Sequence, residues 1–598
     1  MYLPVRSFSL WPALFYDEME DKMKNRFFLR NGSKVLTALA TLSWIVAGII
    51  LASQPGATQS SKGTGVISGT VTADRGVVRG VRVKVKDTAH KITYTVFSRR
   101  GQYKVSDLPP SSYEVRVLQK GFESPVETVA LGAGETKTAN LALKAEAPPP
   151  STVQLVDYDT LYPPGPGRDL LEVTCMGCHG KGMFHRQQRN ADGWRASVEL
   201  MLSGPMPGGQ PAPALGRTNM PARDKEAIVQ YLASNFGPNS PKRDLKLDEL
   251  QVDEDAVADA LFVEYDAPKM EFRRPGRPNP NATHFLHDPY LDAEGQVWYP
   301  SVAANSIVRL NPRERDPEKR WKEWVLPENS GWVFLHGITV DSKNHLFWAE
   351  INGGRVGELD PQTGEMTRHS LPTLGSVLQV AVDSKDNIWY GQVHGVGVGR
   401  IDAKTRRVKQ WPTPTPDASA YGLAIDQKDR AWFAGYGKNV VLMVDPVTDT
   451  VKEYKTLTRA AGPRRLGVDS KGIVWHSEFL SGKIGSINSE TGEQKEYTLP
   501  LRHTHPYETW PDREDNIWIT DHIYGCIIKF DRKTEKFTYY PLPQYGSFGG
   551  GGWSVPKIEV AKDNTIWFGS RGVPNTVAVE FRPKGGTARM TSQLAGDR

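Results

Sequence analysis

The sequence predicts a mainly β, multidomain protein that contains a small β-sandwich, an all-α domain and a seven-bladed β-propeller. Its 598 residues are several times the ~100 to 200 residues of a typical domain. The 56 Gly, 43 Pro and 16 Trp residues are typical of β structure that is rich in turns. A short motif that ends in an aromatic residue also recurs seven times in the C-terminal half.

Charge and cysteine content exclude several classes of function. The 74 basic and 68 acidic residues give a net charge of only +6, and no long basic run lies beside aromatic residues. Nucleic acid is therefore not an expected partner. Two of the three cysteines lie within CMGCH, which excludes a disulfide framework and a Cys-rich zinc site. The third, Cys526, is expected to be a buried thiol.

Residues 1–60 are expected to be an export signal or a membrane anchor with a disordered flank. The uncharged apolar run at 35–52 follows the basic stretch KNRFFLRNGSK, which is the arrangement of an export signal. Its 18 residues lie at the lower end of the length that spans a membrane, so a cleaved signal and a retained anchor both remain open. We expect a periplasmic protein, or one anchored in the membrane and facing the periplasm.

Residues 63–145 predict the sandwich, because alternating runs such as VISGTVT and YEVRVLQ are separated by turn residues. The stretch GQYKVSDLPPSSYEVRVLQKGF resembles the carboxypeptidase regulatory-like fold, which mostly serves as a spacer or adhesion module. No His, Cys or acidic cluster in this region predicts chemistry. AEAPPP at 145–150 is expected to be a stiff linker.

The CMGCH motif predicts one covalently bound c-type haem. Its spacing allows Cys175 and Cys178 to form thioethers with the haem vinyl groups, while His179 presents its imidazole to the iron. The alternatives are a chance CxxCH and a thioredoxin-like CxxC. The histidine directly after the second cysteine and the export signal favour haem.

The haem domain is expected to span residues 151–240. Its last helix is predicted at 222–237, because Ile228, Tyr231 and Leu232 lie on one face. This segment resembles the C-terminal helix of class I cytochromes c, so the domain is expected to be all-α and cytochrome c-like.

The second axial ligand of the iron is less defined by the sequence. Met220 lies before the last helix in TNMPARD, which is where class I cytochromes place their methionine, and is the first candidate. Met206 and Met201 are alternatives, and His185 lies too close to His179 in the chain. An open iron that binds small molecules is the remaining alternative.

Seven repeats predict the propeller at 261–583. The repeated motifs are DAEGQVW, DSKNHLF, DSKDNIW, DQKDRAW, DSKGIVW, DREDNIW and AKDNTIW. They end at Trp298, Phe347, Trp389, Trp432, Trp475, Trp518 and Trp567, with spacings of 49, 42, 43, 43, 43 and 49 residues. A four-stranded blade takes ~40 to 45 residues. The last repeat lacks a fourth strand, so we expect residues 261–268 to pair with 576–582 and residues 584–598 to form a disordered tail.

The repeats, above all HGITVDSKNHLFWAE and LGVDSKGIVWHSEFLSGKIGSI, resemble streptogramin (virginiamycin B) lyase propellers over about 300–583. That resemblance implies a divalent metal such as Mg²⁺ and a His-Glu cluster at the central axis, and related propellers include sugar-lactone hydrolases. On matching repeat positions the resemblance places His336, Glu350 and Glu478 as catalytic candidates. A complete lyase constellation does not map onto the chain.

Strand geometry predicts a polar funnel at one propeller face. Residues five before and nine after the repeat aspartate come to the same edge of an antiparallel pair. These pairs are His287 with Ser301, His336 with Glu350, Tyr421 with Gly435, Arg464 with Glu478, and Tyr507 with Asp521. They predict a ligand funnel in which His336 and Glu350 bind a metal or act as a base. The alternative is that strand ends are polar in any case and that Arg464 and Glu478 form an ion pair.

Two classes of function follow from the sequence. In the first, the haem transfers electrons within an oxidoreductase, or to a redox partner protein, and a small-molecule substrate enters the funnel. In the second, the propeller is a lyase- or lactonase-like enzyme or a ligand-binding platform, with the haem as accessory or sensor. Fold analogy does not choose between them. A haem attached next to the funnel would favour redox coupling.

Overall fold

The structure, a computed structural model, describes most of the chain after residue 62. The described ranges are 63–76, 78–147, 152–177, 180–202, 220–269, 284–302, 304–373, 375–393, 397–544, 555–569 and 577–584. The predicted signal at 35–52 and nearly all of the predicted tail lie outside the described residues. Within them, no helix has the length and apolarity needed to cross a membrane.

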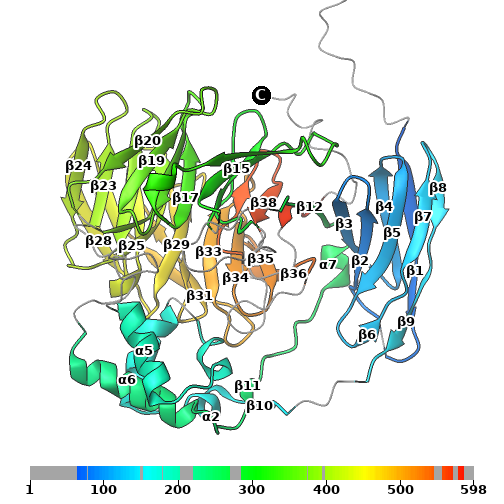
Figure 1. The fold of residues 1–598 in the computed structure, drawn as a ribbon, viewed down its shortest axis with the longest axis horizontal. Helices are drawn as coiled ribbons and strands as arrows, with labels where there is room; N and C mark the ends of the chain where they lie inside the picture. Colours follow the sequence, from blue (N-terminus) through cyan, green and yellow to red (C-terminus); the bar gives the residue numbers. More distant parts are fainter. Residues whose placement is uncertain are drawn as a thin grey trace, which may run out of the picture. The chain divides into compact units, whose positions relative to one another are not determined.

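The N-terminal domain has the predicted sandwich strands. One sheet contains β1 (Gly65–Ala73), β4 (Gln102–Leu108), β6 (Phe122–Glu123), β8 (Thr136–Thr138) and β9 (Leu141–Ala145). The facing strands are β2 (Arg82–Asp87), β3 (Ile92–Phe97), β5 (Ser111–Leu118) and β7 (Glu127–Leu131) (Figure 1). The buried Tyr113 hydroxyl donates to the Pro109 carbonyl at 2.5 Å. This bond explains why a Leu-Pro-Pro turn precedes a Tyr-containing strand.

The next segment is mixed rather than all-α, which corrects the expected class. Its helices are α2 (Tyr158–Leu161), α3 (Pro166–Leu171), the π-helix η1 (Glu172–Met176), the 3-10 helix η2 (Phe184–Arg186), α5 (Ala191–Leu202) and α6 (Ala222–Asn235). Two short strands, β10 (Gln154–Val156) and β11 (Arg243–Leu245), pair in parallel. They join the two ends of the segment, which is why strand appears where helix alone was expected.

The predicted last helix of this segment is confirmed as α6. Ile228 and Leu232 are fully buried against Trp194 of α5 and the surrounding apolar side chains. Tyr231 is only partly buried, and its hydroxyl donates to the Pro163 carbonyl at 3.0 Å. The helix therefore packs on the apolar face that its sequence indicates.

Six four-stranded antiparallel sheets follow one another along the described chain, linked by α7 (Glu254–Val257) to the segment before them. Blade one holds β13 (Tyr290–Leu291), β14 (Val297–Ser301), β15 (Ser306–Leu310) and β16 (Trp321–Val325). Blade two holds β17 (Leu335–Val340), β18 (Leu346–Glu350), β19 (Arg355–Leu359) and β20 (Met366–Ser370). Blade three holds β21 (Ser376–Val382), β22 (Ile388–Val393), β23 (Gly397–Ile401) and β24 (Val408–Pro412).

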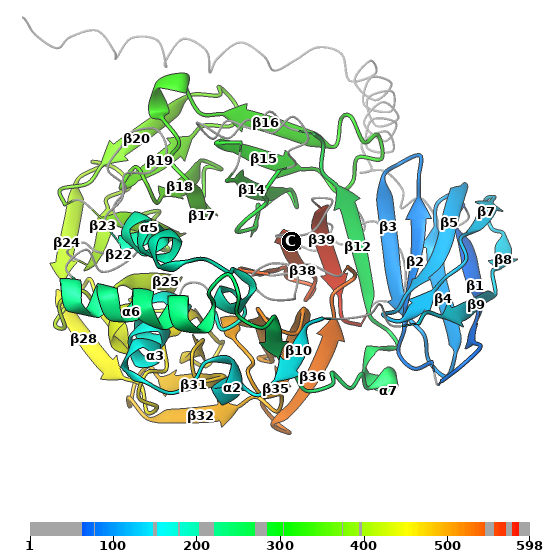
Figure 2. The same ribbon diagram turned by 60° about the horizontal axis from the view of Figure 1, so that its bottom comes forward.

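The remaining blades continue the same meander. Blade four holds β25 (Ala420–Ile425), β26 (Ala431–Gly435), β27 (Val440–Asp445) and β28 (Thr450–Lys455). Blade five holds β29 (Pro463–Val468), β30 (Ile473–Glu478), β31 (Lys483–Asn488) and β32 (Gln494–Thr498). Blade six holds β33 (Pro506–Pro511), β34 (Ile517–Asp521), β35 (Cys526–Asp531) and β36 (Lys536–Pro541). Figure 2 looks onto the blades, with β17, β25 and β38 on the inner side of the ring.

A side-chain hydrogen bond explains the spacing inside each repeat. In five blades the repeat aspartate accepts from the indole Nε1 of the tryptophan six residues later, at 2.8 to 3.0 Å. The donors are Trp298, Trp389, Trp432, Trp475 and Trp518. Blade two has Phe347 at this position, and blade seven has Ala561 in place of the aspartate. Among the described residues, the buried Trp567 Nε1 accordingly has no partner.

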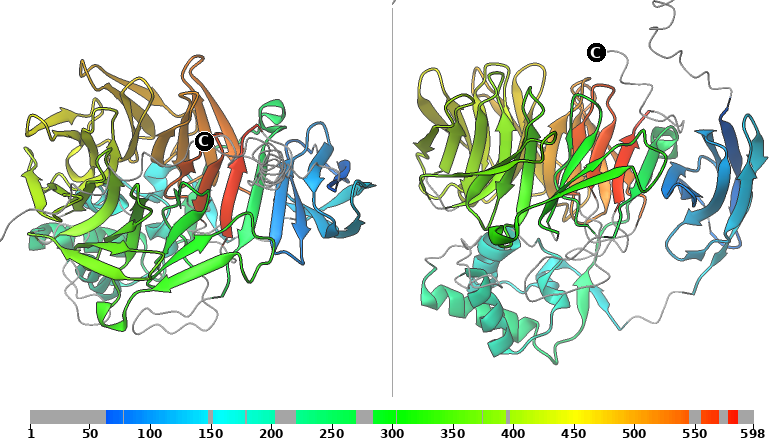
Figure 3. Two further views of the ribbon diagram at one scale, coloured as in Figure 1. Left: turned by 90° about the horizontal axis from the view of Figure 1, so that it is seen from above. Right: turned by 45° about the horizontal axis from the view of Figure 1, so that its top comes forward.

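The seventh blade closes as predicted. Its sheet contains β37 (Glu559–Val560), β38 (Ile566–Gly569), β39 (Val577–Arg582) and β12 (Leu261–Asp266). Strands β12 and β39 pair antiparallel, with Leu261 opposite Arg582 and Asp266 opposite Val577. The other edge of β12 pairs with β3 of the sandwich, so one eight-stranded sheet joins the two domains (Figure 3). The sandwich thus covers the edge of the closing strand.

Candidate functional site

A β-bulge recurs in the innermost strand of five blades. The register shifts in β17, β21, β25, β29 and β33, each time near the start of the strand. Bulges re-aim side chains and often lie next to functional sites. The residues at or beside these shifts include His336, Gln379, Tyr421, Arg464 and Tyr507, all of them buried.

The first members of the predicted funnel pairs converge. The rings of His287 and His336 lie 4.2 Å apart, and His336 meets Tyr421 edge-on at 5.9 Å. The hydroxyls of Tyr421 and Tyr507 lie 2.5 Å apart, and Arg464 stands over the Tyr507 ring at 3.9 Å. The first residue of each predicted pair therefore contributes to one contiguous buried polar cluster.

Glu350 and Glu478 do not join His336, contrary to the sequence-based arrangement. Glu350 accepts two hydrogen bonds from Arg368, at 2.7 and 2.6 Å, inside its own blade. Glu478 accepts from the Ser481 hydroxyl at 2.8 Å, and burial raises its pKa to about 8. Each is the last residue of its strand, β18 or β30, and the neighbouring inner strand carries a bulge. The structure does not assemble the predicted trio, and Arg464 and Glu478 form no ion pair that it records.

Residues that the sequence analysis missed complete the axial cluster, which we define as His287, Asp288, His336, Arg465 and Glu508. Arg465 donates to both carboxylate oxygens of Asp288, at 3.0 and 2.9 Å. Glu508 lies 3.8 Å from Arg465. The three missed residues, Asp288, Arg465 and Glu508, each directly follow a residue that the funnel pairs named, and this adjacency is the signal that could have found them.

Burial and charge set the protonation of the axial cluster. Burial opposes the ionisation of Asp288, but Arg465, followed by His287, outweighs it and holds the pKa of this carboxyl well below its ordinary value. Burial lowers the pKa of His336 well below 6.5, aided by His287, and this imidazole is neutral. Burial raises the pKa of Glu508 to about 8 despite Arg465. The cluster therefore holds one carboxylate and one protonated carboxyl group near neutral pH.

A divalent metal at this position fits the structure poorly. His287, Asp288 and His336 bring one ligand atom each to within 4.8 Å of one another. However, both oxygens of Asp288 are bonded to the Arg465 guanidinium, and His336 Nδ1 lies 2.6 Å from the Leu378 carbonyl oxygen. A divalent cation bound here would lie beside the buried Arg465 guanidinium. It would also have to share the Asp288 carboxylate with that guanidinium.

The CMGCH motif lies against the propeller at Arg464, the residue before Arg465 of the axial cluster. Cys178 and His179 lie outside the described residues, whereas Cys175 is partly buried near the end of η1. Arg464 donates from Nη1 to the Gly177 carbonyl oxygen at 2.6 Å. A Cβ on Gly177 would overlap the hydroxyl of Tyr436. The middle of CMGCH thus contacts a propeller arginine directly.

Aromatic side chains surround this arginine, and we call Tyr421, Tyr436, Arg464, Phe479 and Tyr507 the mouth cluster. The Arg464 guanidinium lies 4.4 Å from the Phe479 ring and 4.9 Å from the Tyr421 ring. It also donates from Nη2 to the Tyr507 hydroxyl at 3.1 Å. Such buried cation–π and charged hydrogen-bond contacts fix the arginine in one position.

One buried histidine beside the motif has no polar partner. His505 is 0% exposed, and among the described residues neither ring nitrogen forms a hydrogen bond. Its Nδ1 lies 2.9 Å from the position that a Cβ on Gly180 would take. Leaving a buried polar group unsatisfied costs about 1 to 3 kcal/mol. This orphaned imidazole beside CMGCH is compatible with a bound prosthetic group that would supply its missing polar partner.

The candidates for the second axial ligand differ in their surroundings. Met220 is 9% exposed and packs in the core of the helical segment. Met201 is 53% exposed, and Met206 lies outside the described residues. Both ring nitrogens of His185 are engaged, by Tyr162 at 3.0 Å and Asp244 at 2.8 Å. Of the candidates that the structure describes, Met220 is thus the buried methionine, Met201 is exposed, and the His185 ring is already hydrogen-bonded.

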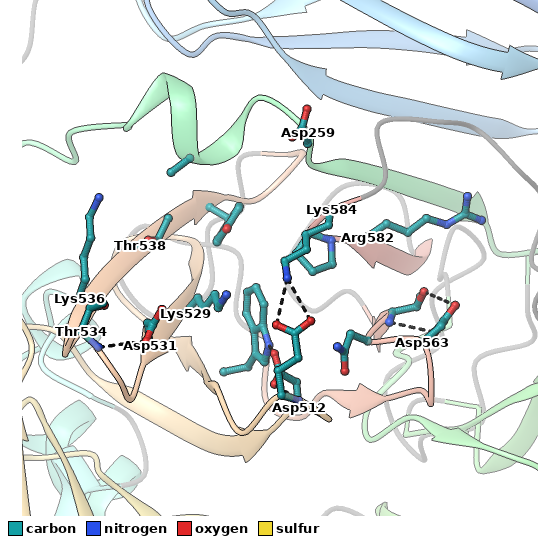
Figure 4. Close-up of a pocket in the computed structure, with 17 residues that line it drawn as sticks. Asp259, Asp512, Lys529, Asp531, Thr534, Lys536, Thr538, Asp563, Arg582 and Lys584 are labelled. Atoms are coloured by element: carbon teal, nitrogen blue, oxygen red, sulfur yellow. Dashed lines mark hydrogen bonds and ion pairs between the residues drawn. The ribbon is translucent and has the colours of Figure 1, made fainter.

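A groove of about 580 Å³ lies elsewhere on the propeller, between blades six and seven. Its lining includes Glu514, Lys529, Lys536 and Lys584 (Figure 4). Lys584 forms an ion pair with Glu514 at 3.0 Å, and Lys536 forms one with Asp253 at 3.1 Å. Two of these lysines are thus already paired with carboxylates, and none of the lining residues belongs to the axial or mouth cluster.

Comparisons with known proteins agree with the two β domains. Residues 287–530 match the virginiamycin B lyase family, and residues 66–144 match the carboxypeptidase regulatory-like domain. No curated protein matches this chain.

Three solved structures align with the propeller region. Virginiamycin B lyase from Staphylococcus aureus is 18% identical, with 52% of this chain and 98% of that chain covered and a TM-score of 0.45. A streptogramin B lyase is 20% identical, with 54% and 97% covered and a TM-score of 0.45. The WD40 propeller domain of Doa1 is 13% identical, with 50% and 94% covered and a TM-score of 0.39. From the family matches, this chain carries a virginiamycin B lyase-like propeller and a carboxypeptidase regulatory-like sandwich.

Proposed function

We propose that this protein is an exported, mono-haem c-type electron-transfer protein in which the haem is coupled to the axis of the propeller. Cys175 and Cys178 would hold the haem covalently, and His179 would be its first axial ligand. The observation that carries the proposal is the 2.6 Å hydrogen bond from Arg464 to the Gly177 carbonyl. It brings the attachment motif onto the buried polar cluster of the propeller.

A contiguous set of contacts supports the coupling. From Gly177 it passes through Arg464 to Tyr507 and Tyr421, whose hydroxyls lie 2.5 Å apart. Tyr421 then contacts His336, and His336 contacts His287 of the axial cluster. A haem bound at the motif supplies one-electron redox chemistry. The chain's own residues would orient it, exclude water and hold a fixed positive charge at Arg464.

The axial cluster would receive the substrate or the surface of a redox partner protein. Arg465 and Asp288 are ionised and buried, whereas Glu508 retains a proton to about pH 8. A protonated carboxyl beside a guanidinium is suited to binding an anionic or carbonyl oxygen and to donating a proton. We propose a small-molecule oxidoreductase reaction at this end of the axis.

The lyase- or lactonase-like alternative has less support. It rests on a metal with a His-Glu cluster, and in this chain Glu350 is paired with Arg368 while Arg465 occupies both oxygens of Asp288. A binding platform with an accessory haem would not need the contact between Arg464 and Gly177. The contact is therefore the feature that favours redox coupling.

The test is expression of the full chain in an export-competent host that matures c-type cytochromes. A reduced pyridine haemochrome of the purified protein should show one covalent haem, which Cys175→Ala with Cys178→Ala abolishes and Cys526→Ala retains. A low-spin spectrum with a band near ~695 nm that Met220→Ala removes would support Met220 as second ligand. Absence of covalent haem from the matured wild type would refute the proposal.

A further inference from the structure

The helical segment, residues 154–248, is attached to the rest of the chain differently from the sandwich. Among the described residues, its apolar core is formed by side chains from 156–247 alone. The sandwich, in contrast, shares two apolar clusters with the propeller. Because β10 and β11 pair in parallel, the chain enters and leaves the helical segment side by side. A unit with its own core on such a two-stranded stalk is suited to rigid-body motion.

Polar contacts hold the helical segment on the propeller. Gly177 accepts the 2.6 Å hydrogen bond from Arg464. Asp248, at the end of the segment, forms a 2.7 Å ion pair with Arg502, and this pair is partly exposed to solvent. Exposed ion pairs contribute little to stability, and polar interfaces between domains permit relative motion. The closed state is therefore held by interactions that can break and form again.

The helical segment closes over the mouth cluster. Gly177 contacts Arg464 and the hydroxyl of Tyr436, and a Cβ on Gly180 would lie 3.8 Å from the Phe479 ring. The mouth cluster in turn contacts the axial cluster, whose members are at most 3% exposed. Solvent therefore does not reach the axial charges in this state.

Two polar atoms of the axial cluster are left without a hydrogen bond. Arg465 Nε and Glu508 Oε2 are buried and have no hydrogen-bond partner among the described residues. Buried polar groups in folded proteins are nearly always hydrogen-bonded. A polar molecule that enters the axis with an oxygen acceptor would satisfy the Arg465 N–H, so this cluster is suited to receiving one.

We infer that the helical segment is a hinged cover over the mouth cluster, and that its opening admits a small polar molecule to the axial cluster. The inference goes beyond the proposed function and does not require a haem at the motif. The stalk of β10 and β11 is the hinge, and the hydrogen bond from Arg464 to Gly177 holds the cover closed. Closure excludes water from the charges at the axis, as lids do in enzymes.

Diethyl pyrocarbonate, a small reagent that acylates neutral imidazole, measures this access in the full chain. His336 reports on the axial cluster, because it is buried and burial keeps its pKa well below the ordinary value. His505, buried beside Gly180, reports on the mouth. His476 is the internal reference, since it is buried against Gly485 within blade five. Mass spectrometry of peptides gives the rate at each histidine.

Gly177→Ala is the opening variant, because it changes the helical segment and leaves the propeller sequence intact. Gly177 has helical backbone angles, φ −54° and ψ −42°, which alanine adopts without strain. The new Cβ would lie 2.0 Å from the Tyr436 hydroxyl oxygen, and this overlap should force the interface apart. In a Tyr436→Ala background the overlap is removed, so the same substitution should have no effect.

We expect Gly177→Ala to raise the modification rates of His336 and His505 about tenfold, which corresponds to about 1.4 kcal/mol in the opening equilibrium. The rate at His476 should not change.

A second variant opens the interface at another point. Asp248→Asn removes the ion pair with Arg502 and should raise the rates at both reporter histidines about twofold. Its control is Glu226→Gln, which removes a comparably exposed ion pair with Arg195 inside the helical segment and should raise neither rate.

Three outcomes would overturn the inference. The first is a wild-type rate at His336 in both Gly177→Ala and Asp248→Asn. The second is a faster rate at His505 alone, since the segment would then move without controlling access to the axis. The third is an equal rise at His476, which would indicate unfolding of the propeller. Absence of covalent haem from the wild type would refute the proposed function alone, because the assay does not use the haem.

Discussion

The Arg464 guanidinium donates a 2.6 Å hydrogen bond to the carbonyl oxygen of Gly177, which joins an inner strand of the propeller to the middle of CMGCH. The two residues are separated by 287 positions in the chain. The Tyr436 hydroxyl packs against Gly177 and leaves no space for a side chain at that position. The arginine therefore both orients the motif and places a positive charge beside it.

Arg464→Met should weaken the attachment of the helical segment to the propeller. A hydrogen bond from a charged donor contributes about 1.5 to 3 kcal/mol, and its loss leaves a buried carbonyl unpaired. In haem-loaded protein we expect the thermal transition that is monitored by haem absorbance to occur at a lower temperature than the transition that is monitored by tryptophan fluorescence. Arg309→Met removes a control arginine that lies over the aromatic rings of Trp298 and Trp324, away from the motif, and should leave the two transitions coincident. Coincident transitions in Arg464→Met would contradict the anchoring role.

Glu508→Gln should change how stability depends on pH. The folded pKa of Glu508 is about 8, above its ordinary value of 4.5, so its stabilising contribution is complete below pH 4.5. Between these values the unfolded state releases a proton that the folded state retains, and the free energy of unfolding falls by up to about 1.4 kcal/mol per pH unit. Urea unfolding from pH 5 to 8 should show this fall in wild type and a flatter profile in the variant.

Glu514→Gln provides the control for this pH profile. Glu514 is half-exposed, and Lys584 lowers its pKa, so the control profile should run parallel to that of wild type between pH 5 and 8. A Glu508→Gln profile that is also parallel to wild type would mean that Glu508 is already ionised in the folded protein.

Ala561→Asp should stabilise blade seven. The substitution restores the aspartate that bonds the indole in five other blades, and Trp567 Nε1 is buried without a partner among the described residues. One new hydrogen bond contributes about 1 kcal/mol, measurable by urea unfolding. In a Trp567→Phe background the same substitution should give no gain, since no indole N–H remains. A gain that persists there would point to another cause.

Lys84→Met should destabilise the junction between the sandwich and the propeller. Lys84 forms a 2.7 Å ion pair with Glu264 on the closing strand β12, and both side chains are buried. An unpaired buried carboxylate costs about 3 to 5 kcal/mol, so chemical unfolding should begin at lower denaturant concentration. Lys104→Met, at an exposed position on β4, should change little. Equal effects of the two substitutions would argue against a structural role for this junction.

The blades and their closure were predictable because they follow from local pattern. The spacing from Asp426 to Trp432 encodes a side-chain hydrogen bond within one hairpin, and its repetition fixes the period of the blade. The missing last strand of blade seven required a partner elsewhere, and residues 261–268 resemble the outer strands of the other blades. Five residues of the polar axial and mouth clusters were also predictable from antiparallel register.

What the sequence by itself determined is therefore the repeat, the sandwich and the CMGCH motif, because each depends on residues close together in the chain. The tertiary structure decided which of the candidate polar residues meet. Bulges in the inner strands turn Arg465 and Glu508 towards the axis, whereas Glu350 pairs with Arg368 inside its blade. The contacts of Arg464 with Gly177 and of His505 with Gly180 join residues about 290 to 330 positions apart. Such contacts depend on how whole domains pack, and no local pattern encodes them.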